Sequence, residues 1–68
     1  MKELVFIVEE SQEGGFYARA VGQSIVTEGE TIEELQQMIR DAVQCHFNET
    51  EKPELIHLHV TRELTFPI

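Results

Sequence analysis

Residues 27–47, TEGETIEELQQMIRDAVQCHF, decide the fold, because they contain the start of a helix and its apolar stripe. Thr31 and Glu34 match a capping box, in which the threonine oxygen accepts from a first-turn N–H and the glutamate reaches back to the N–H of the cap. Gly29, just before the cap, is expected to permit the turn. The helix is therefore predicted to begin at Thr31, with Gly29, Thr31 and Glu34 in structural roles.

The apolar residues that follow Thr31 lie at helical spacing. Intervals of three, four, three, one and four residues keep them on one side of a helix of about four turns. The members of this stripe are Ile32, Leu35, Ile39, Ala42, Val43 and Phe47. Asn48 is the expected cap at the other end, and Pro53 prevents continuation. Such a stripe predicts a helix that packs against a sheet.

Four further stretches have the composition of strands. Residues 3–9, ELVFIVE, are β-branched and aromatic, and residues 16–21 and 24–28 return after turns. A fourth, alternating stretch begins at residue 54. Gly14 and Gly15 are expected to supply the positive φ of the first hairpin. The predicted element order is β-β-β-α-β.

The topology follows from the direction of these strands. Two hairpins make the third strand parallel to the first, and the helix then carries the chain back over the sheet. The fourth strand can therefore lie parallel beside the first. We predict a single α+β domain over residues 1–68, with a mostly antiparallel four-stranded sheet in the order 3-2-1-4. The helix would cover one face, and a second molecule or the tail would cover the other.

The charge balance is strongly acidic. Thirteen Asp and Glu residues stand against five Lys and Arg residues, for a net charge of −8. Such a field repels phosphate backbones and attracts cationic partners, so no direct binding of nucleic acid is expected. Two interpretations remain open: a preference for a basic partner, or a charge that only keeps a small protein in solution.

Nothing in the chain predicts export or a membrane span. The apolar run in MKELVFIVEE is too short and too acidic at its end for a signal peptide, and no run reaches the length of a membrane span. The single cysteine, Cys45, cannot form an internal disulfide. We therefore expect a cytoplasmic protein without membrane contact.

Candidate ligand and catalytic residues are few. His57 and His59 lie two apart on one strand face, where two imidazoles could share a metal, with Cys45, His46 or Glu63 as further ligands. A metal site needs three or four converging ligands, and only two lie on one element. The expectation is a protein that is not an enzyme, with no catalytic residue, metal or cofactor. The alternative is a small metal-binding protein or enzyme that uses His57 and His59.

The last residues remain apolar at alternate positions. Leu64, Phe66 and Ile68 would either complete the sheet or dock on another subunit. A chain of 68 residues has a small core, which favours association. We predict a homo-oligomer, a dimer or a tetramer, with these three residues at the interface. An orphan subunit of a purely structural oligomer is a further alternative.

Two motifs carry a family resemblance. The stretches EESQEGGFYARAV (residues 9–21) and TEGETIEELQQMIRDAV (residues 27–43) resemble the N-terminal domain of the HicB-like antitoxin family. The matched features are Gly-Gly-aromatic-x-Ala at residues 14–18 and Gly-acidic-Thr followed by two glutamates at residues 29–34. VGQSI, at residues 21–25, is shorter than the family's usual stretch and lacks its proline, and Leu35 replaces the usual alanine.

The resemblance implies a fold and a function. The fold would be a partial ribonuclease-H-like sheet with one helix. The function would be that of an antitoxin in a toxin-antitoxin system: a non-catalytic protein-binding module that blocks a small basic ribonuclease toxin of the HicA kind. Full antitoxins continue into a DNA-binding domain, and the resemblance does not extend to one here. Operator binding is therefore not expected of this chain.

Overall fold

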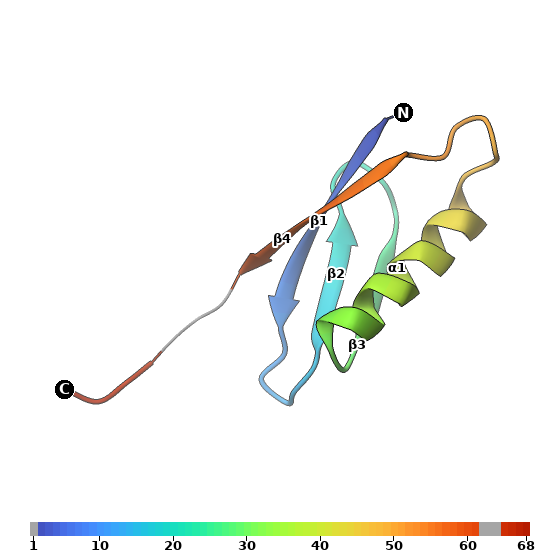
Figure 1. Ribbon diagram of the computed structural model, residues 1–68. Helices are drawn as coiled ribbons and strands as arrows, with labels where there is room; N and C mark the ends of the chain where they lie inside the picture. The colour runs from blue at the N-terminus through green and yellow to red at the C-terminus, as the bar shows by residue number, and fades with distance from the viewer. Residues whose placement is uncertain (1, 62–64) are drawn as a thin grey trace.

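The fold is a four-stranded sheet with one helix on one face (Figure 1). The computed structural model describes residues 2–61 and 65–68. The elements are β1 (Glu3–Glu10), β2 (Phe16–Ala20), β3 (Val26–Gly29), α1 (Ile32–His46) and β4 (Leu55–Thr61). β2 pairs antiparallel with both β1 and β3, and β4 pairs parallel with β1. The order β3-β2-β1-β4 confirms the predicted α+β class, strand order and crossover.

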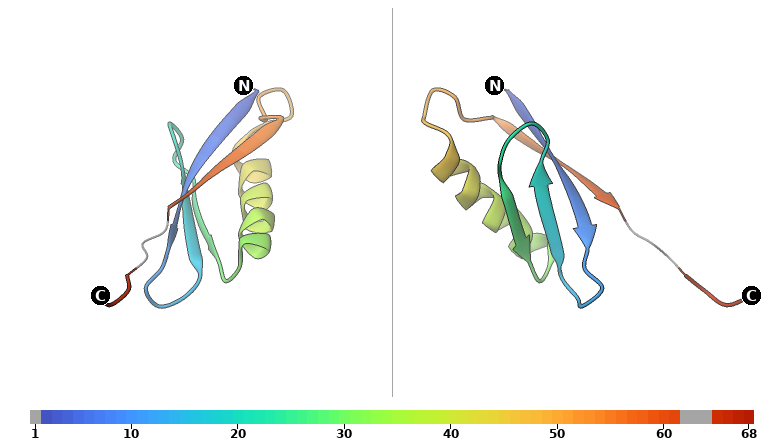
Figure 2. Two further views of the ribbon diagram at one scale, coloured as in Figure 1. Left: turned by 60° about the vertical axis from the view of Figure 1, so that its left-hand side comes forward. Right: turned by 180° about the vertical axis from the view of Figure 1, so that it is seen from behind.

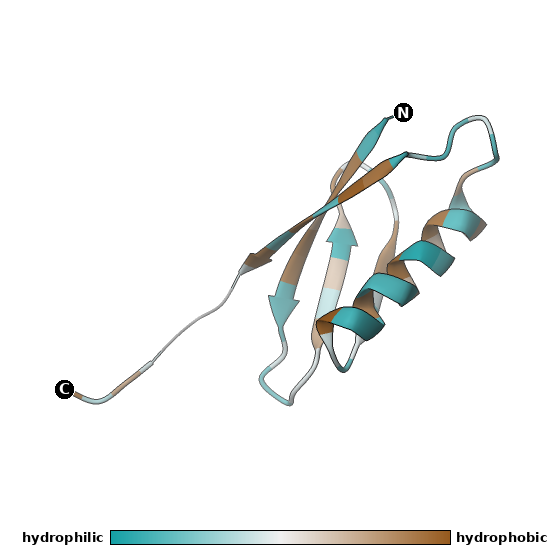
Figure 3. Cartoon of the chain, viewed as in Figure 1, coloured by the Kyte–Doolittle hydropathy of each residue, from teal (hydrophilic) through white to brown (hydrophobic). Residues whose placement is uncertain are grey.

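The core lies between α1 and the sheet. Alternate residues of β1 turn toward the helix, so Phe6 and Val8 are fully buried and pair with Ala20 and Ala18 of β2. The small alanines let the helix approach the sheet. The buried core consists of Leu4, Phe6, Val8, Ala18, Ala20, Ile25, Leu35, Ile39 and Val43. Figure 3 shows the brown, apolar side of α1 turned toward the strands.

Gly29 has a different role from the one predicted. It ends β3 without a positive φ, whereas Gly14 and Gly15 have φ values of 100° and 81°, as expected for the first hairpin. A Cβ on Gly29 would lie 2.7 Å from the backbone nitrogen of Leu35. Gly29 therefore serves the close approach of β3 to the first turn of α1, and not an unusual backbone turn.

The start of α1 confirms the predicted cap in part. Oγ1 of Thr31 accepts a hydrogen bond from the N–H of Glu34 at 3.0 Å. In the described structure the Glu34 carboxylate makes no hydrogen bond back to Thr31, so the second half of the capping box is missing. Glu33 and Glu34 still place negative charge in the first turn, where the helix dipole favours it.

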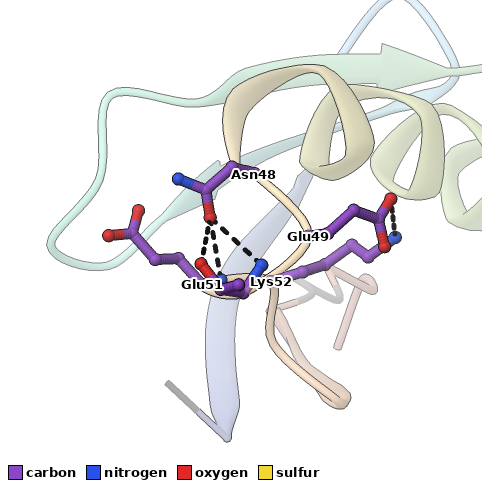
Figure 4. A network of polar contacts seen from close by, with 5 residues as sticks. Asn48, Glu49, Glu51 and Lys52 are labelled. Carbon is purple, nitrogen blue, oxygen red and sulfur yellow. Dashed lines mark hydrogen bonds and ion pairs between the residues drawn. The ribbon is translucent and has the colours of Figure 1, made fainter.

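The end of α1 differs from the prediction by one residue. Phe47, not Asn48, is the cap, and its N–H donates to the carbonyl of Val43. Oδ1 of Asn48 instead accepts from the N–H groups of Thr50 and Glu51 at 3.2 and 3.0 Å. Figure 4 shows Asn48 directed toward Glu51. Asn48 thus shapes the loop to β4, because its amide side chain replaces backbone partners in a tight turn.

The helix does not cover the whole sheet. It lies over β2 and β3, and β4 occupies the opposite side of β1 (Figures 1 and 2). No described residue covers the second face of the sheet. Residues 65–68, which we call the tail, run away from the body of the molecule. The tail does not complete the sheet, so that alternative from the sequence is wrong for these four residues.

Candidate partner-binding surface

The carboxylates gather at one end of the molecule, which we call the acidic end. The antiparallel meander brings together the end of β1, the β1–β2 loop and the end of β3, and α1 begins at the same place. Seven glutamates lie on these segments: Glu9, Glu10, Glu13, Glu28, Glu30, Glu33 and Glu34. All seven are exposed. The described Lys and Arg residues, apart from Arg19 of β2, lie in other parts of the chain.

A hollow of about 480 Å³ lies within the acidic end. Its wall includes the carboxyl-bearing residues Glu13, Glu28, Glu30 and Glu34. Phe16 of β2, on the α1 side of the sheet, and Met38 of α1 provide aromatic and apolar surface beside these acids. Lys and Arg combine a cationic head with an aliphatic stem, so a wall of this composition suits such a side chain.

Tyr17 is tied to the acidic end through Glu9, its cross-strand neighbour. The two residues are opposite each other in the β1–β2 register, and the Tyr17 hydroxyl donates a hydrogen bond to Oε2 of Glu9. This hydrogen bond, together with the negative charge of Glu9, raises the pKa of Tyr17 above its ordinary value. The phenol therefore stays protonated and holds one carboxylate in a fixed position.

The face of the sheet opposite α1 is a second uncovered surface, which we call the open face. Register places Val5 and Ile7 at its centre, between Arg19 of β2 and His59 of β4. Val21 and Val26 continue the apolar patch and are exposed. The open face therefore combines aliphatic side chains with a polar margin, as surfaces that contact other proteins do.

The two histidines predicted as a weak metal pair lie on this open face. Nε2 of His57 is 2.8 Å from Oε1 of Glu3, and this contact joins β4 to β1. His46 is 3.2 Å from Oε1 of Gln23, and Cys45 is exposed on α1. Among residues 2–61 and 65–68, no group of three His, Cys, Asp or Glu side chains is placed to hold a metal ion. Glu63 lies outside the described residues.

The structure describes two of the three predicted interface residues. Phe66 and Ile68 are exposed, at 79% and 121% of the reference area, and touch no core residue. Leu64 lies outside the described residues. Large apolar side chains in this position leave an apolar surface without a partner in the described chain.

Comparison with known proteins shows the family. The chain is 43% identical over 67 residues to a UPF0150 protein of Thermotoga maritima, which covers 98% of this chain and 94% of that protein. It is 50% identical over 52 residues to a UPF0150 protein of Archaeoglobus fulgidus, covering 76% and 77% of the two chains. The chain belongs to the UPF0150 family. No protein-family model and no solved structure matches it at a significant level.

Sequence reasoning missed the acidic end of this UPF0150 fold. Glutamates in two hairpin segments and a helix start are far apart in the sequence, and each has a local explanation as a turn or cap residue. The signal that could have found them was the strand order itself, because the predicted meander already places these segments at one edge. No helix in the described part of the chain is long and apolar enough to cross a membrane.

Proposed function

We propose that the chain is a non-catalytic, cytoplasmic protein-binding module of the HicB-like antitoxin kind, which self-associates and neutralises a small basic ribonuclease toxin. The observation that carries the proposal is the acidic end, with seven exposed glutamates, four of which line a hollow of about 480 Å³. A basic partner would place Lys or Arg side chains against Glu13, Glu28 and Glu30. Blocking an enzyme in this way needs no chemistry from the blocking chain.

The charge of the whole chain supports a basic partner. A net charge of −8 attracts a cationic protein at long range and speeds encounter, and the dense cluster at one end orients the approach. The hollow adds shape to the charge, since Phe16 and Met38 offer contact area for the stems of long cationic side chains. Charge without shape would bind any cation, whereas the combination selects a particular surface.

The resemblance to HicB-like antitoxins supports the class of partner. The Gly-Gly-aromatic-x-Ala and Gly-acidic-Thr motifs that carry it lie on the acidic end, at Gly14 to Ala18 and Gly29 to Thr31. In the structure the first motif approaches the second, since a Cβ on Gly15 would lie 3.0 Å from the carbonyl oxygen of Gly29. The two motifs therefore frame the same hollow.

Inhibition of a toxin tests the proposal. The partner to use is a small basic ribonuclease of the HicA kind encoded by the reading frame next to that of this chain. Purified chain should suppress its cleavage of RNA at a stoichiometric ratio, and co-expression should restore growth that the ribonuclease arrests. The chain alone should cleave no RNA. Undiminished cleavage with an excess of the chain, or cleavage by the chain itself, would refute the antitoxin function.

A further inference from the structure

A groove of about 430 Å³ runs between α1 and the edge strand β4. We call it the α1–β4 groove. Its apolar wall consists of Ile39, Val43, Pro53, Leu55, Ile56 and Leu58. Ile39 and Val43 are otherwise core residues, so the groove is a place where the core reaches the surface. Nothing in the described chain fills it.

The free backbone edge of β4 also needs a partner. β4 pairs with β1 on one side only, which leaves its other edge unpaired, and Val60 and Leu55 along it are exposed. An apolar strand edge of this kind is a template for a further strand, and native proteins cover it. An extended apolar segment would both fill the groove with its side chains and pair its backbone with the free edge of β4.

The tail is such a segment. Phe66 and Ile68 are two residues apart, so an extended backbone places both side chains on one face. Pro67 between them lacks an N–H, which an edge strand tolerates. The tail lies beyond the end of β4 that is far from Pro53 and points away from the groove of its own chain (Figures 1 and 2).

We propose that the α1–β4 groove of one copy binds the tail, residues 65–68, of a second copy, as a strand added antiparallel to β4. The inference rests on the self-association in the proposed function and deepens it. In a two-fold pair joined edge to edge, opposite residues lie on the same face of the sheet. Placing Phe66 opposite Ile56 puts Ile68 opposite Glu54 and the two-fold axis at Thr61. Each copy then places its tail in the groove of the other copy.

The register agrees with the chemistry of the groove. It places the tail beside Glu54, Leu55 and Ile56, which line the groove. Ile56 lies on the α1 side of the sheet, because it pairs with the buried Leu4, and Phe66 enters on that side. The tail thus covers the half-buried side chains that α1 leaves open.

The charges along this surface are nearly balanced. Two molecules of net charge −8 repel each other, and the acidic end repels most strongly. β4 and the tail carry no Asp or Glu, and the groove is lined by Arg40 and Lys52 together with Glu54. The groove itself is therefore close to neutral, while the two-fold axis at Thr61 lies beside Glu9, its partner in the β1–β4 register.

Disulfide trapping tests the register while leaving Phe66 and Ile68 in place. In a Cys45→Ser background, Leu55→Cys and Pro67→Cys place thiols at directly opposite positions, about 4.5–5.5 Å apart between Cα atoms, which a disulfide spans. Mild oxidation should give a covalent dimer that reductant separates. Val26→Cys with Pro67→Cys, on the other edge of the sheet, is the matched control and should give none. A dimer yield no higher than in this control, or a disulfide within a single chain, would overturn the proposal.

A substitution separates this inference from the toxin-binding function. Phe66→Asp should raise the dissociation constant of the dimer by about tenfold or more, since a buried aromatic anchor is lost, whereas Val26→Asp should not. Sedimentation velocity measures both. A wild-type chain that is monomeric throughout would refute self-association as well. A dimer that is unaffected by Phe66→Asp would refute only the tail in the groove and leave inhibition of the ribonuclease intact.

Discussion

At the scale of single residues, the contact between Tyr17 and Glu9 makes the acidic end measurable. Tyr17 is the one tyrosine of a chain without tryptophan, so absorbance at 295 nm reports its ionisation alone. The hydrogen bond to Glu9 raises the pKa of Tyr17, and Glu9→Gln should lower it toward the ordinary value of about 10. Glu28→Gln, on the other side of Tyr17, is the control and should change it less. An equal effect of both variants would contradict the specific contact.

The same contact fixes the direction of a pH effect on stability. Because the pKa of Tyr17 is higher in the folded chain than in the unfolded one, the contact stabilises the fold below about pH 10. Its contribution is lost as the pH rises through the raised pKa. Urea unfolding between pH 8 and pH 11 should show this loss in the wild type and a weaker loss in Glu9→Gln.

Gly29 gives a second prediction at this scale. A methyl group at Gly29 would meet the backbone of Leu35 at 2.7 Å, so Gly29→Ala should destabilise the fold by about 1–3 kcal/mol. Gly22 has a φ of 84° and open space around it, so Gly22→Ala meets backbone strain alone, about 1 kcal/mol. Urea denaturation compares the two. The steric account of Gly29 fails if Gly29→Ala is the milder change.

At the scale of elements, α1 depends on its threonine cap more than on Glu34. Thr31→Ala should cost about 0.5–2 kcal/mol, because the N–H of Glu34 loses its acceptor. Glu34→Ala should change stability little, since its carboxylate makes no hydrogen bond to the cap and relief of repulsion offsets the lost dipole interaction. Thr31→Ser should retain most of the stability. Thermal unfolding of the three variants checks the order, and a larger cost for Glu34→Ala would show a complete capping box.

The elements were also what the sequence could predict. The stripe from Ile32 to Phe47 and the alternation of β1 and β4 depend on neighbours along the chain, so helix, strands and order follow from local spacing. The acidic end and the α1–β4 groove depend on register between distant segments. Asn48 shows the limit of prediction from local sequence, because an asparagine side chain can either cap a helix or shape a loop. Here Phe47 is the cap, so Asn48 shapes the loop.

At the scale of the whole molecule, the two proposed contacts use different cavities of the fold. The acidic end lies where β1, β3 and the start of α1 meet, and the α1–β4 groove lies beside the end of α1 and the loop to β4. No β4 residue lines the hollow of the acidic end, so a dimer joined through β4 leaves both hollows open, although its two-fold axis at Thr61 lies beside Glu9. Each dimer should bind two copies of a basic partner, and light scattering of the complex should give equal numbers of the two chains.

The affinity of two variants of equal net charge for the basic ribonuclease tests the central claim most directly. Glu28→Gln with Glu30→Gln removes two charges from the acidic end, and Glu49→Gln with Glu51→Gln removes two from the loop before β4. Titration calorimetry should show a dissociation constant raised about tenfold or more for the first pair and nearly unchanged for the second. Equal weakening by both pairs would mean that net charge alone attracts the partner and would contradict a binding site at the acidic end.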